Sequence, residues 1–419
     1  MSNLHEAQND RITHLHVKGL RCIDDLSLSL DGLMVLIGEN GSGKSSILQA
    51  LHLLSCASRS VEYCEEVIQS LYGGIDNLLR FGCNEMTLAI SAKVRMPDET
   101  HFAEVKYGIV VERARSGIRI RTERLTLVEP DGKHVRIINR EGQTVHVLVP
   151  TAREPQRSFV AEGSLVLLQL GLTAHWAAVR VVQLLDGIQV HVPFEVRPHW
   201  QLHERALGES PRRRVKAHTV SRLDRYGFNL ANCLMNLRNR RESWDALLLE
   251  LRVVLGQHFT DFHLFVDNGF QVVRPVFDGI ERDLDVLSEG QLGYLLHCVM
   301  LRLPPTGVVA IDEPELHLHP SMVARLAWRF EFAAESRCVL VATHSATFLD
   351  QLTEPAKSVY VCRLREADSA MEIVRLDAVR LQEWLTDYRG VGELADTGHL
   401  VHVLEQAATP TESPRGAAE

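Results

Sequence analysis

The sequence lacks a hydrophobic run long enough to cross a membrane, and its first residues lack the pattern of a secretion signal. Apolar runs such as residues 33–37 and 308–311 are far shorter than the roughly 20 residues that a membrane helix needs. Residues 1–10 are polar and contain no hydrophobic segment of the kind that signal peptides carry. These absences predict a cytoplasmic protein without a membrane partner.

Paired cysteines are also missing, because the eight cysteines are scattered along 419 residues without a C-x-x-C spacing. Scattered thiols in apolar surroundings are typical of a reducing compartment and argue against a disulfide scaffold. The sequence has no internal repeat and no long heptad run. With 45% apolar and 24% charged residues, it has the composition of a globular chain with one large core and a smaller lobe.

The formal net charge of −9 argues against a protein that coats nucleic acid, but the charge is unevenly distributed. Residues 205–241 contain ten basic and two acidic residues. Arginines in such a stretch bind DNA tightly at low salt, because they release counterions. A solvated surface or a docking surface for a partner has the same composition. DNA contact by residues 205–241 is therefore one of three open interpretations.

Hydrophobic periodicity predicts the order of the secondary structure. Residues 12–30 alternate around a turn and predict a hairpin, residues 33–37 predict a buried parallel strand, and residues 44–57 predict a helix. Residues 86–149 alternate as antiparallel strands do, and residues 160–260 are more helical. From residue 286 onward strand and helix signals alternate, as in α/β proteins.

The expected fold is therefore α/β, a mixed sheet flanked by helices, with an antiparallel β subdomain and a helical insertion. Residues 10–85 and 276–405 are expected to build the two halves of one nucleotide-binding head, and residues 86–275 the insertion between them. Residues 406–419 are expected to be a disordered tail because they are polar and rich in Pro and Thr.

A phosphate-binding loop is predicted after the strand at residues 33–37. Residues 38–45 match G-x-x-x-x-G-K-[ST] between a strand and a helix, the context that this motif requires. Glycines let the backbone wrap phosphates, so that N–H groups face negative charge. Lys44 is expected to reach the β- and γ-phosphates, and the Ser45 hydroxyl to bind Mg²⁺. The predicted nucleotide contacts are Gly38, Glu39, Asn40, Gly41, Ser42, Gly43, Lys44, Ser45 and Ser46.

Two further motifs end apolar strands. The strand at residues 307–311 is followed by Asp312, expected to hold Mg²⁺, and by Glu313, expected to polarise an attacking water. The strand at residues 338–342 is followed by Thr-His-Ser. Its His344 is expected to hydrogen-bond the γ-phosphate and to hold the water in line with Glu313.

A third motif, Leu-Ser-Glu-Gly-Gln at residues 287–291, lies upstream of the Asp-Glu strand. Ser288 and Gln291 have the spacing of a capping box and predict the start of a helix. Gly290 would let a phosphate approach the backbone. Ser288, Gly290 and Gln291 are therefore predicted to contact nucleotide.

Together these motifs resemble the P-loop, signature, Walker B motif and switch histidine of ABC-type ATPases. Residues 313–320, 225–231 and 392–394 further resemble RecF-like and OLD-like ATPases of bacteria, and the resemblance extends over about residues 10–400. It implies a P-loop NTPase fold of the ABC type, with ATP and Mg²⁺ as cofactors. It also implies that two heads sandwich ATP, so that Ser288 and Gly290 act on the nucleotide of a second copy, in a homodimer or higher oligomer.

The sequence departs from parts of this pattern. No D-x-D follows His344, so a chain without its own TOPRIM nuclease is expected, with a separate effector such as a nuclease as a partner. The Q-loop glutamine has no clear counterpart. Gln169 is one candidate, but its apolar surroundings favour a buried helix residue instead. The pairs His14/His16 and His317/His319 lack a third ligand at a sensible spacing, which disfavours a metal site at either pair.

The leading hypothesis is an ATPase that serves DNA repair or antiphage defence with a partner effector. One alternative is the nucleotide-binding subunit of a membrane transporter, which the long interval between Lys44 and Ser288 disfavours. Another is an ATP-dependent scaffold with slow hydrolysis.

Overall fold

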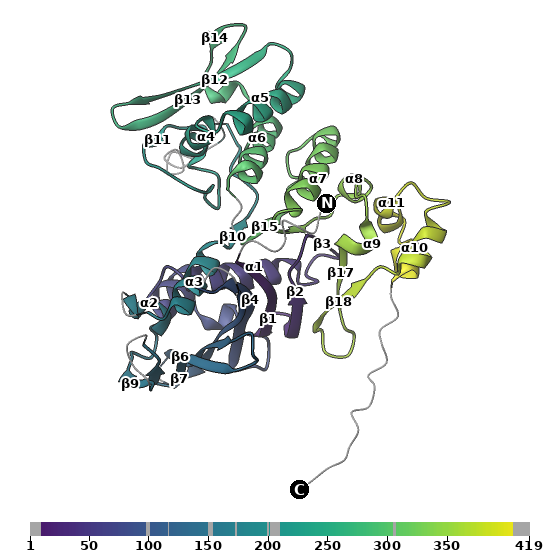
Figure 1. Cartoon of the computed structure of the whole chain (residues 1–419). Coiled ribbons are helices and arrows are strands. Elements are labelled where there is room, and N and C mark those ends of the chain that lie inside the picture. Colours follow the sequence, from purple (N-terminus) through teal and green to yellow (C-terminus); the bar gives the residue numbers. More distant parts are fainter. Residues whose placement is uncertain are drawn as a thin grey trace.

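The computed structural model describes residues 10–97, 101–115, 117–149, 154–171, 174–198, 201, 210–304 and 307–404. They form an eight-stranded β lobe, a six-stranded sheet that carries the phosphate-binding loop, and a helical lobe with a small sheet of its own (Figure 1). The expected tail, residues 406–419, lies outside the described residues, as do Arg205 and Glu209 of the basic stretch. The α/β class expected from the sequence is confirmed.

The β lobe is an antiparallel sheet with the strand order β2-β1-β4-β5-β6-β7-β8-β9. Its strands are β1 (Arg11–Leu20), β2 (Ile23–Ser29), β4 (Glu85–Arg95), β5 (Phe102–Ala114), β6 (Gly117–Val128), β7 (His134–Glu141), β8 (Thr144–Val147) and β9 (Gln156–Phe159). The predicted hairpin is confirmed, since β1 and β2 pair with Leu15 opposite Leu28. Every second residue of β4 is buried, because one face of the sheet packs on helices.

Four helices accompany this lobe. They are α1 (Lys44–Cys56), a π-helix (Cys64–Leu71), α2 (Val166–Gln169) and α3 (Trp176–Asp186), with a 3₁₀ turn at Ile75–Asn77. Helices α1 and α3 contact β4 and β5, respectively, and each other. The predicted helix after the P-loop is therefore confirmed, and it joins the β lobe to the central sheet.

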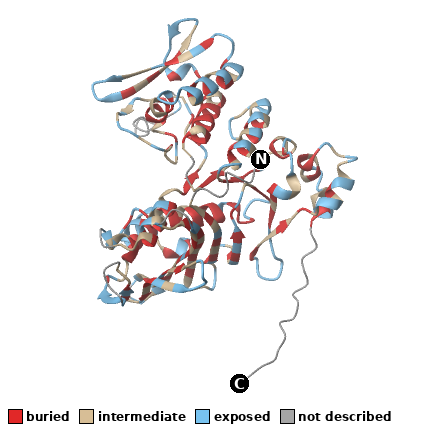
Figure 2. Cartoon of the chain, in the orientation of Figure 1, coloured by how far each residue is buried: buried red, intermediate tan, exposed pale blue. Residues whose placement is uncertain are grey.

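The central sheet has the order β10-β15-β16-β3-β17-β18 and is parallel except for β18. Its strands are β10 (Gln189–His191), β15 (Val308–Asp312), β16 (Cys338–Ala342), β3 (Leu33–Ile37), β17 (Val359–Leu364) and β18 (Met371–Arg375). Alternate residues of the central strands face two different cores: Met34 and Leu36 one, Val35 and Ile37 the other. Burial on both faces explains the unbroken apolar runs (Figure 2).

The helical lobe is inserted between β10 and β15. It contains β11 (Val215–Lys216), α4 (Leu230–Arg238), α5 (Arg241–Leu255), β12 (Phe259–Asp267), β13 (Phe270–Phe277), β14 (Ile280–Glu281), a 3₁₀ turn (Leu284–Val286) and α6 (Glu289–Arg302). The expected domain boundary at 275/276 falls inside β13, which pairs with β12 and β14. The chain returns to the central sheet only after α6, because the signature helix packs on α4 and α5.

The remaining helices cover the other face and the end of the central sheet. They are α7 (Pro320–Ala334), α8 (Ala346–Leu349), α9 (Pro355–Ser358), α10 (Ala378–Trp384), α11 (Val391–Asp396) and a 3₁₀ segment (His399–Val403). Helix α11 contacts α8, the short helix that follows the strand of the switch histidine.

Candidate functional site

The predicted phosphate-binding loop joins β3 to α1, at the carboxyl end of the parallel strands. Its glycines are required by geometry. Gly43 has φ 103°, and a Cβ there would lie 2.5 Å from Met371 Sδ and 2.7 Å from Cys22 Sγ. A Cβ on Gly38 would overlap the Cys362 carbonyl oxygen. The loop is thus packed against β17, β18 and the β1–β2 turn.

Lys44 lies at the start of α1 with its side chain folded over the loop. Its Nζ donates hydrogen bonds to the carbonyl oxygens of Gly38, at 2.8 Å, and Glu39, at 3.0 Å. Burial lowers the pKa of this ammonium, and Cys362, Asp312 and Glu313 oppose that effect. A buried cation held by neutral carbonyls lacks a strong anionic partner, and a phosphate group would supply one.

Ser45 and Asp312 are 267 residues apart but meet at the same edge of the sheet. The Ser45 hydroxyl donates to Asp312 Oδ2 at 3.0 Å, because α1 follows β3 and Asp312 ends β15, with only β16 between the two strands. A hydroxyl and a carboxylate oxygen are hard ligands that suit Mg²⁺. No group of three or more His, Cys, Asp or Glu side chains that could hold a metal occurs among the described residues. Mg²⁺ suits such a sparse site, since it binds through one or two protein oxygens plus phosphates.

Glu313 occupies a strained position beside Asp312. Its φ of 47° lies in the left-handed region, and its N–H donates to the Ala342 carbonyl at 2.8 Å. This hydrogen bond from β15 to the end of β16 holds the strained residue in place. Left-handed backbone at a residue that is not glycine is typical of functional sites.

Glu315, for which no role is predicted from the sequence, links the Walker B segment to the switch segment. Its Oε1 accepts hydrogen bonds from Thr343 Oγ1, at 2.7 Å, and from the His344 N–H, at 2.8 Å. Its Oε2 is buried and has no hydrogen-bond partner among the residues that the structure describes. The His344 side chain is exposed at the end of β16. Glu315 therefore fixes the backbone of His344 while the imidazole stays accessible.

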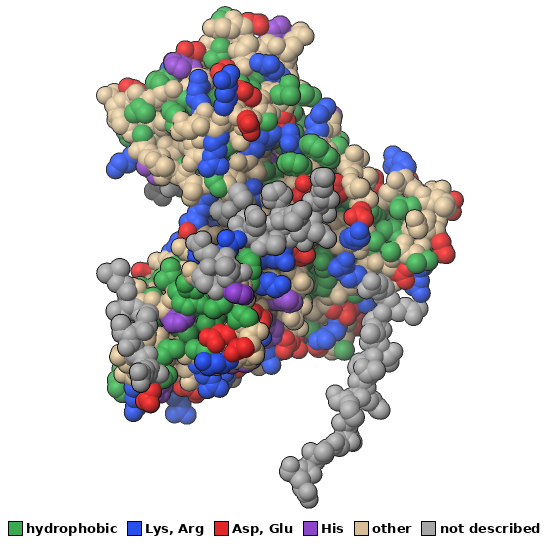
Figure 3. Space-filling model, in the orientation of Figure 1, with side chains coloured by type: hydrophobic (Ala, Val, Ile, Leu, Met, Phe, Trp, Pro, Cys, Tyr) green, Lys and Arg blue, Asp and Glu red, His purple; other side chains and the backbone are tan. Residues whose placement is uncertain are grey.

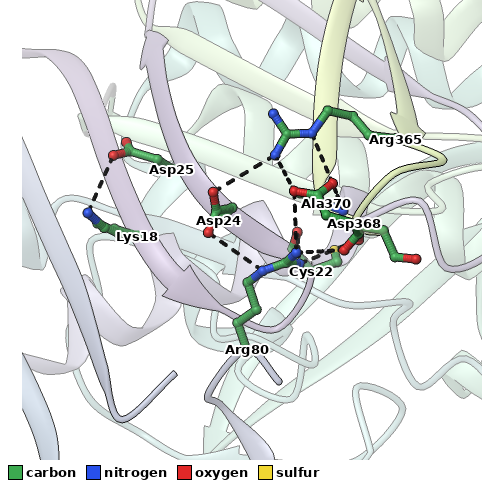
Figure 4. Close-up of polar contacts among 9 residues, drawn as sticks. Lys18, Cys22, Asp24, Asp25, Arg80, Arg365, Asp368 and Ala370 are labelled. Atoms are coloured by element: carbon green, nitrogen blue, oxygen red, sulfur yellow. Dashed lines mark hydrogen bonds and ion pairs between the residues drawn. The ribbon is translucent and has the colours of Figure 1, made fainter. Parts of the chain in front are cut away.

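A cluster of ion pairs supports the loop from the side (Figure 4). Arg80 donates to the carbonyl oxygens of Cys22, at 3.2 Å, and Asp368, at 2.7 Å. Asp24 lies 3.6 Å from Arg80 and 3.8 Å from Arg365. These contacts join the β1–β2 hairpin to the β17–β18 hairpin, which contain Cys22 and Met371, the two residues packed against Gly43. No sequence pattern predicts this cluster, because its members come from three distant segments.

The predicted capping box at the signature is confirmed. The Gln291 N–H donates to Ser288 Oγ at 3.2 Å, and the Ser288 N–H donates to Gln291 Oε1 at 3.0 Å. Gln291 Nε2 also donates to the Val254 carbonyl at 3.3 Å. The Gln291 side chain is thus engaged within the helical lobe, whereas Ser288 and Gly290 line an open pocket of about 650 Å³.

That pocket contains none of the P-loop residues. It is lined by Pro198, Gln201, Arg212, Asp285, Val286, Leu287, Ser288, Glu289, Gly290, Gln291, His317, His319 and Met322. His317 closes one side: its Nδ1 lies 3.0 Å from Glu289 Oε2, and a Cβ on Gly290 would lie 2.6 Å from the His317 carbonyl oxygen. The signature therefore packs directly on the segment that follows Glu313 and Glu315.

The described part of the basic stretch is largely used for internal contacts. Buried Arg212 donates to the carbonyl oxygens of Val196, Leu284 and Leu287. Arg222 pairs with Asp186, Arg225 donates to His52, and Arg238 donates to the Phe262 carbonyl. Figure 3 shows Lys and Arg side chains as separate groups over the helical lobe, without one continuous basic patch on the face drawn. Arg212 in particular holds the loop that leads into the signature.

Gln169, the candidate for the Q-loop glutamine, is the last residue of α2 and is exposed in the β lobe. The chain passes from the central sheet to the helical lobe after β10, which pairs with β15 so that His191 lies beside Ile311. His191 is buried, and burial lowers its pKa to about 3. The segment after β10, and not α2, is therefore positioned next to the Walker B strand.

Two family models match parts of the chain. One, described as an AAA ATPase domain, matches residues 11–102, which include the P-loop. The other, described as "AAA domain, putative AbiEii toxin, Type IV TA system", matches residues 235–350, which include the signature, Walker B motif and switch histidine. No curated protein matches the chain by sequence.

Solved structures of SMC heads are similar to the chain at low identity. The SmcHead bound to the C-winged helix domain of ScpA has 15% identity and a TM-score of 0.48, over 87% of this chain and 98% of that one. The SMC head domain from Thermotoga maritima has 13% identity and a TM-score of 0.41, over 87% and 99%. The Smc head with an extended coiled coil bound to the C-terminal domain of ScpA, from Pyrococcus furiosus, has 12% and 0.46, over 90% and 99%.

Within the described ranges, every helix is too short or too polar to cross a bilayer.

Proposed function

We infer that this chain, an ABC-type AAA ATPase head of the SMC/RecF kind, binds Mg²⁺·ATP and hydrolyses it between two copies of itself. We further propose that the cycle controls a partner effector in a DNA transaction or in antiphage defence. The observation that carries the proposal is the convergence of Lys44, Ser45, Asp312, Glu313 and His344 at one edge of the central sheet, although they come from three separate parts of the sequence.

Each of these residues has a task in phosphoryl transfer to water. Lys44 would exchange its carbonyl partners for phosphate oxygens, and Ser45 and Asp312 would hold Mg²⁺, which neutralises phosphate charge when bound. Glu313 would orient and polarise the attacking water. His344, exposed at the end of β16, would contact the γ-phosphate, with its backbone held by Glu315. Positioning and electrostatics supply most of the catalysis in such reactions.

A second copy is proposed because the signature and the P-loop lie on different lobes of one chain. Ser288 and Gly290 line a pocket that contains no P-loop residue, so they would meet the nucleotide of a partner. Backbone N–H groups at the start of α6 suit an anion there. A two-fold arrangement would then form two equivalent ATP sites.

Two observations bear on the biological setting. The description of one matching family, a putative AbiEii toxin of a type IV TA system, supports a defence role. The internal contacts of Arg212, Arg222, Arg225 and Arg238 weaken the case for DNA binding by residues 205–241. Among the described residues of that stretch, the exposed basic side chains that could contact DNA are those of Arg214, Lys216, Arg238, Arg240 and Arg241.

The test is steady-state ATP hydrolysis by the wild type, Lys44→Ala and Glu313→Gln, with and without double-stranded DNA at low salt. Glu366→Gln is the matched control, since Glu366 is an exposed glutamate in the β17–β18 turn. We expect Lys44→Ala to lose ATP binding, and Glu313→Gln to bind ATP, lose turnover and accumulate as a dimer on size-exclusion chromatography.

Each outcome decides one part of the proposal. DNA stimulation that vanishes in both variants supports action on nucleic acid, and turnover that ignores DNA supports a sensor gated by a partner protein. Equal, very slow turnover by the wild type and Glu313→Gln would support the scaffold alternative. No ATP binding by the wild type would refute the proposal.

A further inference from the structure

We propose that Asp350 and the first turn of α11 form a clamp that positions the switch histidine, so that the C-terminal helices control hydrolysis at this head. The proposal rests on the function inferred above and deepens it. It gives a role to residues 392–394, which the site described so far does not use.

The clamp is a close contact between α8 and α11. Asp350 follows α8 directly, and its Oδ1 accepts hydrogen bonds from the N–H groups of Gly392, at 2.7 Å, and Glu393, at 3.3 Å. A Cβ on Gly392 would overlap the Ala346 carbonyl oxygen, and one on Gly390 would overlap the Asp350 carboxylate. Both glycines are therefore needed for the two helices to approach this closely.

Helix α8 cannot fix its own position. It has four residues, Ala346–Leu349. A single helical turn is unstable in isolation, because the backbone entropy lost in forming it exceeds the stabilisation by its first hydrogen bond. Its orientation is set by its neighbours. On one side, the Phe348 ring packs against Phe330 of α7, with ring centroids 5.8 Å apart. On the other side, the only described helix in extensive contact with it is α11.

His344 stands between two anchors. Its own N–H is bound by Glu315, and the next residue, Ser345, caps α8 through a hydrogen bond from the Phe348 N–H at 3.2 Å. One anchor therefore belongs to the Walker B segment and the other to the clamped helix. A shift of α8 would move the backbone that follows His344, while Glu315 would still hold the His344 N–H. The direction of the imidazole would therefore change.

Helix α11 belongs to a larger C-terminal unit, residues 377–404, because it packs on the 3₁₀ segment His399–Val403. Rings of Trp384, Tyr388, His399 and His402 pack together, with Trp384 stacked on His402 at 5.2 Å. Tyr388 Oη and His399 Nδ1 are hydrogen-bonded at 2.8 Å, and the Asp377 N–H donates to the Val403 carbonyl at 2.7 Å. A force applied anywhere on this unit would reach α8 through Asp350. Asp350 is thus a positioning residue, because it acts on the site through His344.

The test uses the full-length protein with Asp350→Ala, Asp350→Asn and Gly392→Ala. Asp350→Asn retains an oxygen acceptor, so it should be milder than Asp350→Ala. Asp396→Asn is the matched control, since Asp396 is exposed at the far end of α11. The measured quantities are the hydrogen exchange of amides 344–350 and 391–394 without nucleotide, the melting temperature, the affinity for a fluorescent ATP analogue, and the steady-state kcat and KM.

We expect faster exchange in both segments, unchanged nucleotide affinity, and a kcat lowered about tenfold or more by misplacement of a catalytic group. A merely structural role would lower the melting temperature and leave the kcat of the folded fraction unchanged. Exchange that rises without any change in kcat would overturn the proposed control, and unchanged exchange in Asp350→Ala would overturn the clamp. If the wild type does not hydrolyse ATP, the proposed function fails, but the exchange experiment still decides whether the clamp exists. Should Gly392→Ala fail to fold, the Asp350 pair suffices.

Discussion

At the scale of single residues, Glu313 combines a proposed chemical task with an unfavourable backbone conformation. Its φ of 47° is left-handed, a conformation that costs a residue with a Cβ roughly 1–2 kcal/mol. Glu313→Gly and Glu313→Ala should both abolish hydrolysis, because both remove the carboxylate. Glu313→Gly should nevertheless be more stable than Glu313→Ala by about 1 kcal/mol, since glycine adopts this φ without steric cost. Urea denaturation of the two proteins measures the difference, and equal stability would show that the site is unstrained.

The sequence predicts the residues of this site better than it predicts the side chains that hold their backbone in place. Lys44, Ser45 and Asp312 are predicted for the site because the chemistry of phosphate and Mg²⁺ demands those residue types next to a strand end. Glu315 and Arg212 could not, because a glutamate that binds a backbone N–H and an arginine that binds carbonyls carry no spacing rule. The hydrogen bonds of Glu315 to His344 and of Arg212 to Leu287 become visible only in three dimensions.

At the scale of elements, two glycines near the start of α6 differ in the space around them. A Cβ on Gly290 would lie 2.6 Å from the His317 carbonyl oxygen, whereas one on Gly293 would meet nothing closer than 3.5 Å. We expect Gly290→Ala to destabilise the protein by about 1–3 kcal/mol through overpacking against backbone. Gly293→Ala should be neutral or stabilising by up to about 1 kcal/mol, because alanine favours helix.

Chemical denaturation of the two variants, one helical turn apart, makes the comparison. A Gly290→Ala protein as stable as Gly293→Ala would mean that the segment containing His317 yields easily. In that case the packing of the signature on this segment would not constrain it.

Elements with a strong pattern were predictable, and those without one were not. Strands β3 and β15 and the β1–β2 hairpin follow directly from apolar runs and alternation. The sheet of the helical lobe was missed because its strands have weak patterns: much of β12 toward its end is exposed or half-buried, with Val266 56% exposed. The expected boundary at 275/276 therefore fell inside β13.

At the scale of the whole molecule, the Arg80 cluster joins the β lobe to the last hairpin of the central sheet (Figure 4). The Arg80 side chain is only 13% exposed and pairs with Asp24 and Asp368. Arg80→Met should lower the free energy of unfolding by about 2 kcal/mol, since hydrogen bonds from charged donors are lost. Arg363→Met is the control, because Arg363 is 47% exposed in its pair with Glu372 and should cost less than about 1 kcal/mol. Equal effects in urea denaturation would count against a bracing role for Arg80.

The last prediction concerns the proposed arrangement of two heads, which can be tested by mixing variants. Ser288→Asp keeps an N-cap residue, because aspartate caps helices as well as serine does, but it places a negative charge where a partner's γ-phosphate would lie. Ser288→Asn keeps the cap without the charge and serves as the control. We expect Ser288→Asp alone and Lys44→Ala alone to be inactive, and Ser288→Asn to retain activity.

A mixture of Ser288→Asp and Lys44→Ala should regain turnover if the signature acts in trans. In a mixed dimer, the intact P-loop of the first variant meets the intact signature of the second, so one complete site forms. If the signature acted on its own chain's nucleotide, each variant would carry its defect into every dimer and the mixture would stay inactive. Steady-state hydrolysis as a function of mixing ratio distinguishes the two, since only the trans arrangement gives a maximum at equal proportions.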